Sequence, residues 1–142
     1  MNNAMRYLGL ARKAGHLEVG EENVGTAVRL GKAKLVVLAA DSSENARSRA
    51  RGFLYGKKTP LLTLPFSKED ISLALGKNGC SMAAFTDIGL ASSFVTAMAQ
   101  DAPDTYEEIA QLLRAKNERS KQRMAESKAQ SGNKKTGKRR RT

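Results

Sequence analysis

Apolar and polar residues follow one another along the chain in a pattern that predicts helices and strands in turn. Apolar residues recur at helical spacing over residues 4–13 and again in the stretch between Gly20 and Gly31. Residues 35–40 form a continuous apolar run of strand length, which is typical of a strand covered on both faces. The same reasoning predicts further strands at 16–19, 60–64 and 81–85 and further helices at 43–54, 67–75 and 90–99.

Strands that alternate with helices of this length predict a layered α/β domain. We expect a three-layer α/β/α sandwich with a mixed central sheet of about four strands, formed by residues 1–100. Residues 101–142 are expected to be a linker, a C-terminal helix and a basic tail; the helix begins at the capping-box spacing of Thr105 and Glu108. From Ser131 onward we expect disorder, because this segment cannot bury enough apolar area to offset the entropy of ordering it.

Positive charge is concentrated at the carboxyl end of the chain. Residues 116–142 contain 11 Lys and Arg and 2 Asp and Glu, whereas residues 1–115 contain 14 and 12, so +9 of the formal net charge of +11 lies in the tail. Such asymmetry indicates a nucleic acid or an anionic membrane surface as partner, although a solubilising tail is an alternative. The end of the tail has no aromatic residue for base stacking, so sequence-independent phosphate contacts are expected there, from Lys134, Lys135, Lys138, Arg139, Arg140 and Arg141.

Composition also argues against several classes of function. No apolar run is long enough to span a bilayer, no signal-peptide stretch opens the chain, and no lipidation signal accompanies the basic tail, so we expect a cytoplasmic protein with no membrane partner. One Cys and one His leave too few soft ligands for zinc, and no metal or cofactor is expected. His16 has no catalytic partner indicated by the sequence, and Cys80 is interpreted as a small packed residue. With no catalytic residue in view, we expect a protein that is not an enzyme.

The first forty residues carry the most specific pattern. The pattern there predicts a helix, a short strand, a second helix and a buried strand. The stretches that carry it are Leu8–Gly15, Gly20–Arg29 and Leu35–Asp41, the last being the strand with its following residue. This order resembles the small RNA-binding ribosomal proteins of the L-seven-Ae / L-thirty-e family, and most closely their short bacterial YlxQ-like branch. The resemblance covers essentially all of residues 1–100. It implies a monomeric module that recognises structured RNA of the kink-turn type, in rRNA or another RNA, in association with the ribosome.

In that family the start of the second helix contacts RNA, through a motif that reads Gly-x-Asn-Glu-x-x-Lys. The resemblance implies that Gly20 allows close approach of RNA and that Glu22 and Asn23 bond to base edges, with Glu21 beside them. Here the Asn and Glu stand in the opposite order, and Thr26 takes the place of the Lys. A helix amino terminus offers unpaired N–H groups to an acceptor. Two carboxylates there also suit the helix dipole without any ligand, so both interpretations stay open.

Two loops are expected beside this helix. The first follows the buried strand, where Ser42 and Ser43 are candidates for phosphate contacts and Asp41 is expected to cap the next helix, with Glu44 at capping-box spacing. The second is polar and glycine-rich, and a plain turn explains it equally well. Its candidate RNA contacts are Lys77, Asn78 and Gly79.

Other basic residues are interpreted as a solvated face: Arg47, Arg49, Arg51, Lys57 and Lys58. The leading hypothesis is therefore an RNA-binding, ribosomal-protein-like module. The alternative is a protein-interaction adapter on the same fold, with polyanion binding by the tail alone. An orphan domain of an RNA-modifying enzyme is a third hypothesis, which the missing catalytic residues disfavour. Capture of RNA after deletion of the tail would separate the first two.

Overall fold

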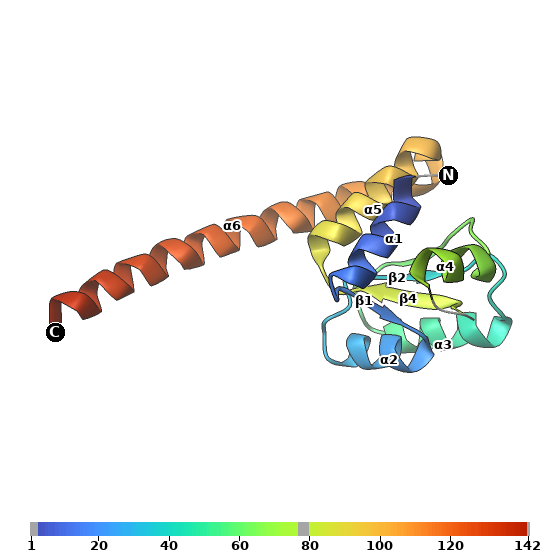
Figure 1. Ribbon diagram of the computed structural model, residues 1–142, viewed down its shortest axis with the longest axis horizontal. Coiled ribbons are helices and arrows are strands. Elements are labelled where there is room, and N and C mark those ends of the chain that lie inside the picture. Colours follow the sequence, from blue (N-terminus) through green and yellow to red (C-terminus); the bar gives the residue numbers. More distant parts are fainter. Residues whose placement is uncertain (1–2, 77–79, 142) are drawn as a thin grey trace.

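The computed structural model describes the backbone of residues 3–76 and 80–141, and the side chains of residues 3–76 and 80–128. Helices and strands alternate as predicted (Figure 1). The helices are α1 (Asn3–Lys13), α2 (Glu21–Arg29), α3 (Glu44–Leu54), α4 (Lys68–Leu75), α5 (Ile88–Asp101) and α6 (Pro103–Arg141). The strands are β1 (Leu17–Val19), β2 (Leu35–Leu38), β3 (Leu61–Thr63) and β4 (Met82–Phe85).

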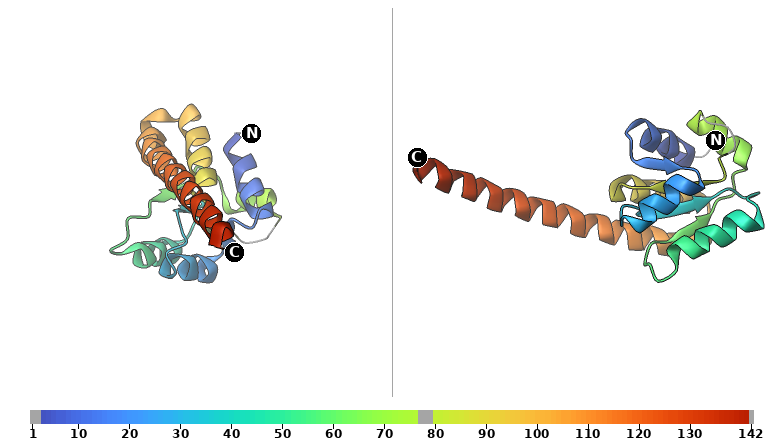
Figure 2. Two further views of the ribbon diagram at one scale, coloured as in Figure 1. Left: turned by 90° about the vertical axis from the view of Figure 1, so that its left-hand side faces the viewer. Right: turned by 90° about the horizontal axis from the view of Figure 1, so that it is seen from below.

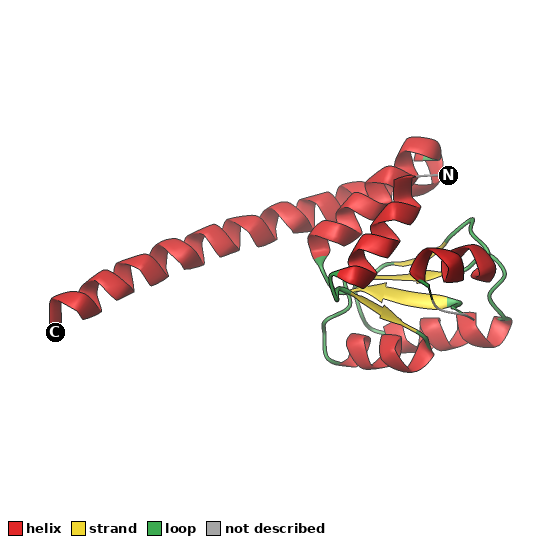
Figure 3. Ribbon diagram, in the orientation of Figure 1, coloured by secondary structure: helices red, strands yellow, loops and turns green. Residues whose placement is uncertain are grey.

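The four strands form one mixed sheet in the order β1-β4-β2-β3 (Figure 3). β4 lies antiparallel to both β1 and β2, and β2 lies parallel to β3, with Val36 facing Ala84 on one side and Leu61 on the other. Every residue of β2 and β4 is buried, because helices cover both faces of these central strands. The predicted mixed sheet of about four strands is thus confirmed.

Helices cover the sheet on both faces, which confirms the three-layer α/β/α architecture. α2 and α3 lie side by side on one face, and α1, α4 and α5 lie on the other (Figure 1, Figure 2). The core under α1, α4 and α5 is the larger of the two and includes the tilted ring pair Phe85–Phe94, whose centroids lie 5.0 Å apart. The core under α2 and α3 is built from smaller side chains such as Val24, Val36 and Ala50.

The strand directions give the sheet two distinct ends. β1, β2 and β3 all run the same way, so their last residues meet at one end, which we call the carboxyl edge. α2, α3 and α4 begin at the carboxyl edge, because each follows one of these strands directly. At the opposite end, the amino edge, α2 and α3 finish and their connections return to β2 and β3.

The capping of α3 differs from the prediction. Ser43, not Asp41, caps α3, and its Oγ accepts a hydrogen bond from the N–H of Ala46 at 3.1 Å. Asp41 instead accepts a hydrogen bond from the N–H of Lys68 at 2.8 Å, and so satisfies a further N–H at the start of α4, whose cap is Ser67. The reason is tertiary: the backbone of Ala40 is bonded to Phe66, which places Asp41 beside α4 rather than at the end of α3.

The packed part of the chain continues beyond residue 100, where the sequence analysis placed the end of the domain. α5 ends at Asp101, Pro103 opens α6, and the two helices pack together as a hairpin. Tyr106, Ala110 and Leu113 are buried against the larger core. The expected boundary therefore lies inside a helical hairpin, and the last buried residue on α6 is Leu113 among those whose side chains are described.

The basic tail is also helical where disorder is expected. α6 continues through Arg141 and projects away from the domain (Figure 1). Lys and Arg, which make up six of the twelve residues from Ser131 to Thr142, have high helix propensity and favour continuation of the helix, whereas Gly132 and Gly137 oppose it. A helix without a packing partner is nevertheless marginal in water, so its order depends on propensity and on whatever binds it.

Candidate nucleic-acid interface

The start of α2 has a backbone conformation that glycine alone adopts readily. Gly20 is the residue that precedes α2, with φ 94° and ψ 155°. Its N–H donates to the carbonyl of Met82 at 3.0 Å, which ties the turn to β4. No atom lies within 4 Å of the position that a Cβ would occupy. The conformation, not a lack of space, therefore calls for glycine here, and the space above the turn is open.

The first turn of α2 carries no side-chain cap. The α3 and α4 amino ends are both capped by serine hydroxyls, from Ser43 and Ser67. The N–H groups at the start of α2 thus keep their capacity to bond an outside acceptor, in a region of partial positive charge.

Asn23 is used within the domain. Its Nδ2 donates to the backbone carbonyl of Val19 at 2.9 Å, across the turn from β1 to α2. The bond holds the end of β1 against the first turn of the helix. An amide has two donor hydrogens and an acceptor oxygen, so the Asn23 oxygen and the second hydrogen remain for a ligand.

A hollow of about 410 Å³ lies between α2 and α3. Glu21 on α2 and Arg49 on α3 form an ion pair across it, at 3.0 Å. Both groups are partly exposed, so the pair contributes little to stability, but it fixes the direction of the Arg49 guanidinium. The other residues around the hollow are Glu22, Gly25, Thr26, Arg29 and Phe53. The carboxylate of Glu22 is exposed and has no ion-pair partner among the described residues.

Thr26 occupies the place of the cation in the expected motif, and a neighbouring arginine reaches it. Its hydroxyl donates to the carbonyl of Glu22 at 3.0 Å and accepts from a terminal nitrogen of Arg29 at 3.2 Å. Arg29, one turn further along α2, thus places a positive charge beside position 26. The sequence analysis does not single out Arg29, although its spacing of three residues from Thr26 is visible in the sequence, and it interprets Arg49 as part of a solvated face.

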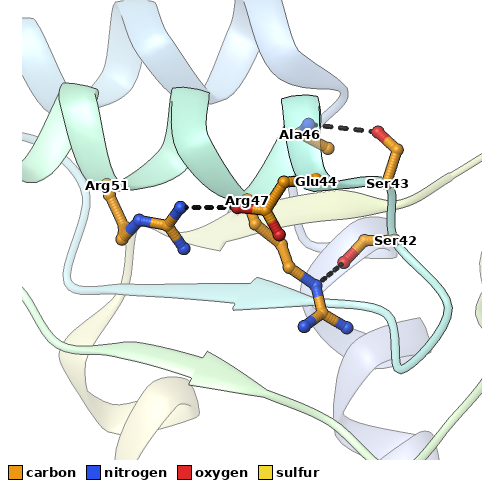
Figure 4. A network of polar contacts seen from close by, with 6 residues as sticks. All are labelled: Ser42, Ser43, Glu44, Ala46, Arg47 and Arg51. Atoms are coloured by element: carbon orange, nitrogen blue, oxygen red, sulfur yellow. Dashed lines mark hydrogen bonds and ion pairs between the residues drawn. The ribbon is translucent and has the colours of Figure 1, made fainter.

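The loop after β2 is held by Arg47 of α3. Its guanidinium donates to the Ser42 Oγ at 3.2 Å and to the carbonyl of Ala40 at 2.9 Å. Figure 4 shows Arg47 pointing back toward this loop, while Arg51 on the same helix pairs with Glu44. Ser42 is 8% exposed and its Oγ accepts from Arg47, so within the domain this residue holds the loop, while its predicted phosphate contact stays a prediction. Ser43 is exposed, and its hydroxyl hydrogen remains available beyond its capping role.

Those predicted RNA contacts that the structure describes in the globular domain therefore lie together at the carboxyl edge. The start of α2, the loop at Ser43 and the segment before β4 all lie at this edge, where Gly20 and Ala39 bond to the backbone of Met82 and Ser81. Lys77, Asn78 and Gly79 lie outside the described residues. The side chains of the predicted phosphate contacts in the tail also lie outside the described part, namely Lys134, Lys135, Lys138, Arg139, Arg140 and Arg141.

The arrangement matches a known protein family. Residues 2–95 fit the model of the ribosomal protein L7Ae/L30e/S12e/Gadd45 family. The chain belongs to this family. Membership confirms the expected family and supports the prediction that the chain is not an enzyme.

Individual relatives agree with this assignment. The chain is 38% identical over 74 residues to the RNA-binding protein YlxQ of Enterococcus faecium, a match that covers 52% of this chain and 71% of the relative. A protein of unknown function from Bacillus halodurans has a similar structure, with a TM-score of 0.63 and 24% identity over 68% of this chain and 97% of that one. The 15.5kD RNA binding protein of Giardia lamblia gives a TM-score of 0.54 and 17% identity over 68% and 82%. The two structures bear on the fold alone.

Two other features are absent from the described residues, namely a membrane-spanning helix and a cluster of metal ligands. Within residues 3–76 and 80–141, no helix has both the length and the apolar character needed to cross a membrane. The same residues hold no cluster of three or more His, Cys, Asp or Glu side chains that could ligate a metal ion.

Proposed function

We propose that this chain is an RNA-binding, ribosomal-protein-like module that recognises structured RNA at the carboxyl edge of its sheet. The observation that carries the proposal is the start of α2, where a required glycine and an uncapped first turn present free N–H groups beside an exposed carboxylate. Family membership and the relative named an RNA-binding protein support it. The expected cytoplasmic location and association with the ribosome are part of the same proposal.

We further propose that the preferred RNA is of the kink-turn type, in which bases are unstacked and a groove is widened. In this scheme Glu22 accepts hydrogen bonds from base amino groups, and the free N–H groups of the first turn bond acceptors on base edges. Arg29 and Arg49 flank the hollow between α2 and α3 and meet phosphates on either side. Recognition then depends on RNA shape and on exposed bases, as is usual for proteins that do not read a regular duplex.

The test compares binding of a kink-turn RNA and of a plain duplex of equal length, by titration calorimetry. We expect the full-length protein to prefer the kinked RNA, and Glu22→Ala to reduce that preference by roughly 1–3 kcal/mol, the scale of a specific base contact. Glu108→Ala is the charge-matched control, because Glu108 is an exposed glutamate on the α5–α6 hairpin rather than at the start of a helix at the carboxyl edge. It should remove the same charge and leave the preference unchanged.

Equal affinity for kinked and plain RNA in the full-length protein would contradict recognition at the carboxyl edge. A Glu22→Ala variant that keeps the preference would remove this residue from the interface.

A protein-interaction adapter on the same fold remains the second candidate. The observation that favours it is that Glu21 and Asn23, two of the expected RNA contacts, are already bonded within the domain. Such an adapter would bind RNA through the tail only. Deletion of residues 116–142 would then abolish all RNA binding, whereas the RNA-binding module would keep its preference for the kinked RNA.

A further inference from the structure

The amino edge, opposite to the proposed RNA site, carries a second concentration of positive charge. A hollow of about 260 Å³ lies there, and four of the nine residues around it are lysines: Lys34, Lys57, Lys58 and Lys116. None of the nine is acidic. Lys34 follows α2, Lys57 and Lys58 follow α3, and Lys116 belongs to α6, so three separate parts of the chain supply the charge.

The lysines are held together by the backbone of the two connections. The Thr59 hydroxyl donates to the carbonyl of Ala33 at 3.3 Å, and the N–H of Val36 donates to the carbonyl of Pro60 at 3.0 Å. The N–H of Lys57 donates to the carbonyl of Leu54 at 2.9 Å. The connection after α3 is therefore fixed beside the connection after α2, which places Lys34, Lys57 and Lys58 around one hollow.

The four ammonium groups have no ion-pair partner among the described residues. Arg49, Arg51 and Arg114 differ in this respect, because each pairs with a carboxylate at 3.0 Å or less. Neighbouring unpaired cations repel one another, and a polyanion that enters the hollow relieves this repulsion.

An exposed aromatic ring stands next to this charge. Tyr55 is 88% exposed and precedes Lys57 by two residues. Gly56 between them has φ 74°, a left-handed conformation that ends α3 sharply and leaves the tyrosine outside the core. An exposed ring beside unpaired lysines is the combination by which proteins hold single-stranded nucleic acid, through stacking on bases and attraction to phosphates.

The charge continues from the hollow onto α6, which leaves the domain from the amino edge (Figure 1, Figure 2). Beyond Lys116 the helix presents exposed cations at Arg119, Lys121, Arg123 and Lys128. From Lys116 to Arg141 the helix spans about 38 Å at 1.5 Å per residue. α6 thus carries further cations outward from the hollow, within reach of an extended strand of nucleic acid.

We propose that this amino edge is a second RNA-binding surface, in which Lys34, Lys57, Lys58 and Lys116 bind phosphates of a single-stranded segment and Tyr55 stacks on one of its bases. This proposal rests on the proposed function for the identity of the ligand, RNA. It goes beyond that function because the amino-edge surface lies at the other end of α2 from Glu21 and Glu22. The surface selects single strands without reading their sequence. A kinked RNA with a single-stranded extension then contacts both edges of the domain.

A first experiment measures the lysines in the full-length protein. We expect Lys57→Gln with Lys58→Gln to weaken binding of a single-stranded oligouridylate roughly three- to tenfold, and to lower the salt slope by about one unit, as for two lost phosphate contacts. The charge-matched control is Arg6→Gln with Lys68→Gln, on α1 and at the start of α4, which begins at the carboxyl edge. An equal loss in both pairs would overturn the proposal, because it would show a response to net charge alone.

A second experiment detects stacking directly. The chain contains no tryptophan, so Tyr55→Trp introduces a single indole whose fluorescence reports on its surroundings. We expect the oligouridylate to quench it and Tyr55→Ala to weaken binding by roughly fivefold or more, with Tyr55→Phe close to the original. Leu73→Trp, at a position 76% exposed on α4, is the control and should stay unquenched. Quenching by phosphatidylserine vesicles but not by RNA would overturn the proposal in favour of a lipid surface.

The two proposals fail separately. Both surfaces are supported if Glu22→Ala loses the preference for kink-turn RNA and the oligouridylate quenches the fluorescence of Tyr55→Trp. A protein without kink-turn preference that still shows quenching and the lysine effect refutes only the carboxyl-edge proposal. A protein with kink-turn preference but neither of those effects refutes only the amino-edge surface.

Discussion

The side-chain amide of Asn23 donates a hydrogen bond to the backbone carbonyl of Val19 at 2.9 Å, and so closes the turn on which the proposed RNA site is built. Val19 is the last residue of β1, and Asn23 lies in the first turn of α2. The bond ties the helix to the strand, but it satisfies none of the N–H groups that a side-chain cap at Gly20 would accept from. The same residue therefore has a structural role that must be separated from any contact with RNA.

Asn23→Ala should lower the free energy of unfolding by about 1 kcal/mol, because the Val19 carbonyl loses its partner. The thermal midpoint should fall by several degrees for a domain of this size. Asn45→Ala is the control, since Asn45 is exposed in the first turn of α3 and makes no side-chain hydrogen bond among the described residues. Thermal melts of both variants measure the difference. Unchanged stability in Asn23→Ala would mean that the bond to Val19 is not maintained in solution.

Gly20→Ala should destabilise the protein by roughly 1–3 kcal/mol, because its φ of 94° is strained for any residue with a Cβ. Gly52→Ala should act in the opposite direction. Gly52 lies in the interior of α3 with open space around it, where alanine has the higher helix propensity by about 1 kcal/mol. Denaturant titrations of the two variants should thus give shifts of opposite sign. A stable Gly20→Ala protein would show that the turn can relax, and would weaken the argument for a fixed approach of RNA there.

Arg49 and Arg51 offer a matched pair for the hollow between α2 and α3. Both are exposed arginines on α3, and each pairs with one carboxylate, Glu21 and Glu44 respectively. Arg49→Gln should weaken binding of kink-turn RNA by about 1–2 kcal/mol, the scale of a hydrogen bond to a charged group, with little change in stability. Arg51→Gln, which lies away from the hollow, should bind RNA nearly as before. Equal effects of the two changes would indicate general electrostatic attraction rather than a defined contact.

The sequence predicts those parts of the fold that depend on local pattern. The apolar runs at β2 and β4 indicate strands covered on both faces, and the structure buries every residue of both. Gly20 likewise predicts the start of α2, because the conformation at this residue is a local property of the chain.

Features that depend on contacts between distant residues could not be predicted in this way. Asp41 has the local spacing of a cap for α3, yet its hydrogen bond goes to Lys68, 27 residues away. Arg49, which the sequence analysis places on a solvated face, meets Glu21 across 28 residues and so borders the hollow between α2 and α3. The lysine hollow is assembled from two connections and from α6, so no single stretch of sequence shows it.

The docking of α6 should respond to alkaline pH through Tyr106. Burial raises the pKa of the Tyr106 phenol above its ordinary value of 10.0, because the charged form is desolvated. The folded state therefore holds this proton more tightly than the unfolded chain. The resulting contribution to stability is fully present below about pH 10 and is lost as the pH rises through the folded pKa. Tyr106→Phe lacks this proton, so the stability difference between the two proteins should change with pH only in the alkaline range, as measured by urea titrations at a series of pH values.

Deletion of residues 116–142 should separate general attraction to RNA from recognition of its shape. The shortened chain ends at Ala115 and keeps Tyr106, Ala110 and Leu113, so the buried contacts of α6 with α5 remain. The deletion removes +9 of the net charge, and we expect weaker binding to every RNA with the order of preference among RNAs unchanged.

Salt dependence gives the magnitude of this effect. If the six cations in the last nine residues each neutralise one phosphate, the full-length protein should lose affinity with a log-log slope on the order of −4 to −5 from the tail alone. The shortened protein should show a correspondingly shallower slope, because its remaining contacts come from the two edges of the domain. Fluorescence anisotropy with one labelled kink-turn RNA, measured over a range of salt concentrations, compares the two proteins directly. Parallel slopes would mean that the tail does not touch the RNA, and that the domain alone supplies the electrostatic attraction.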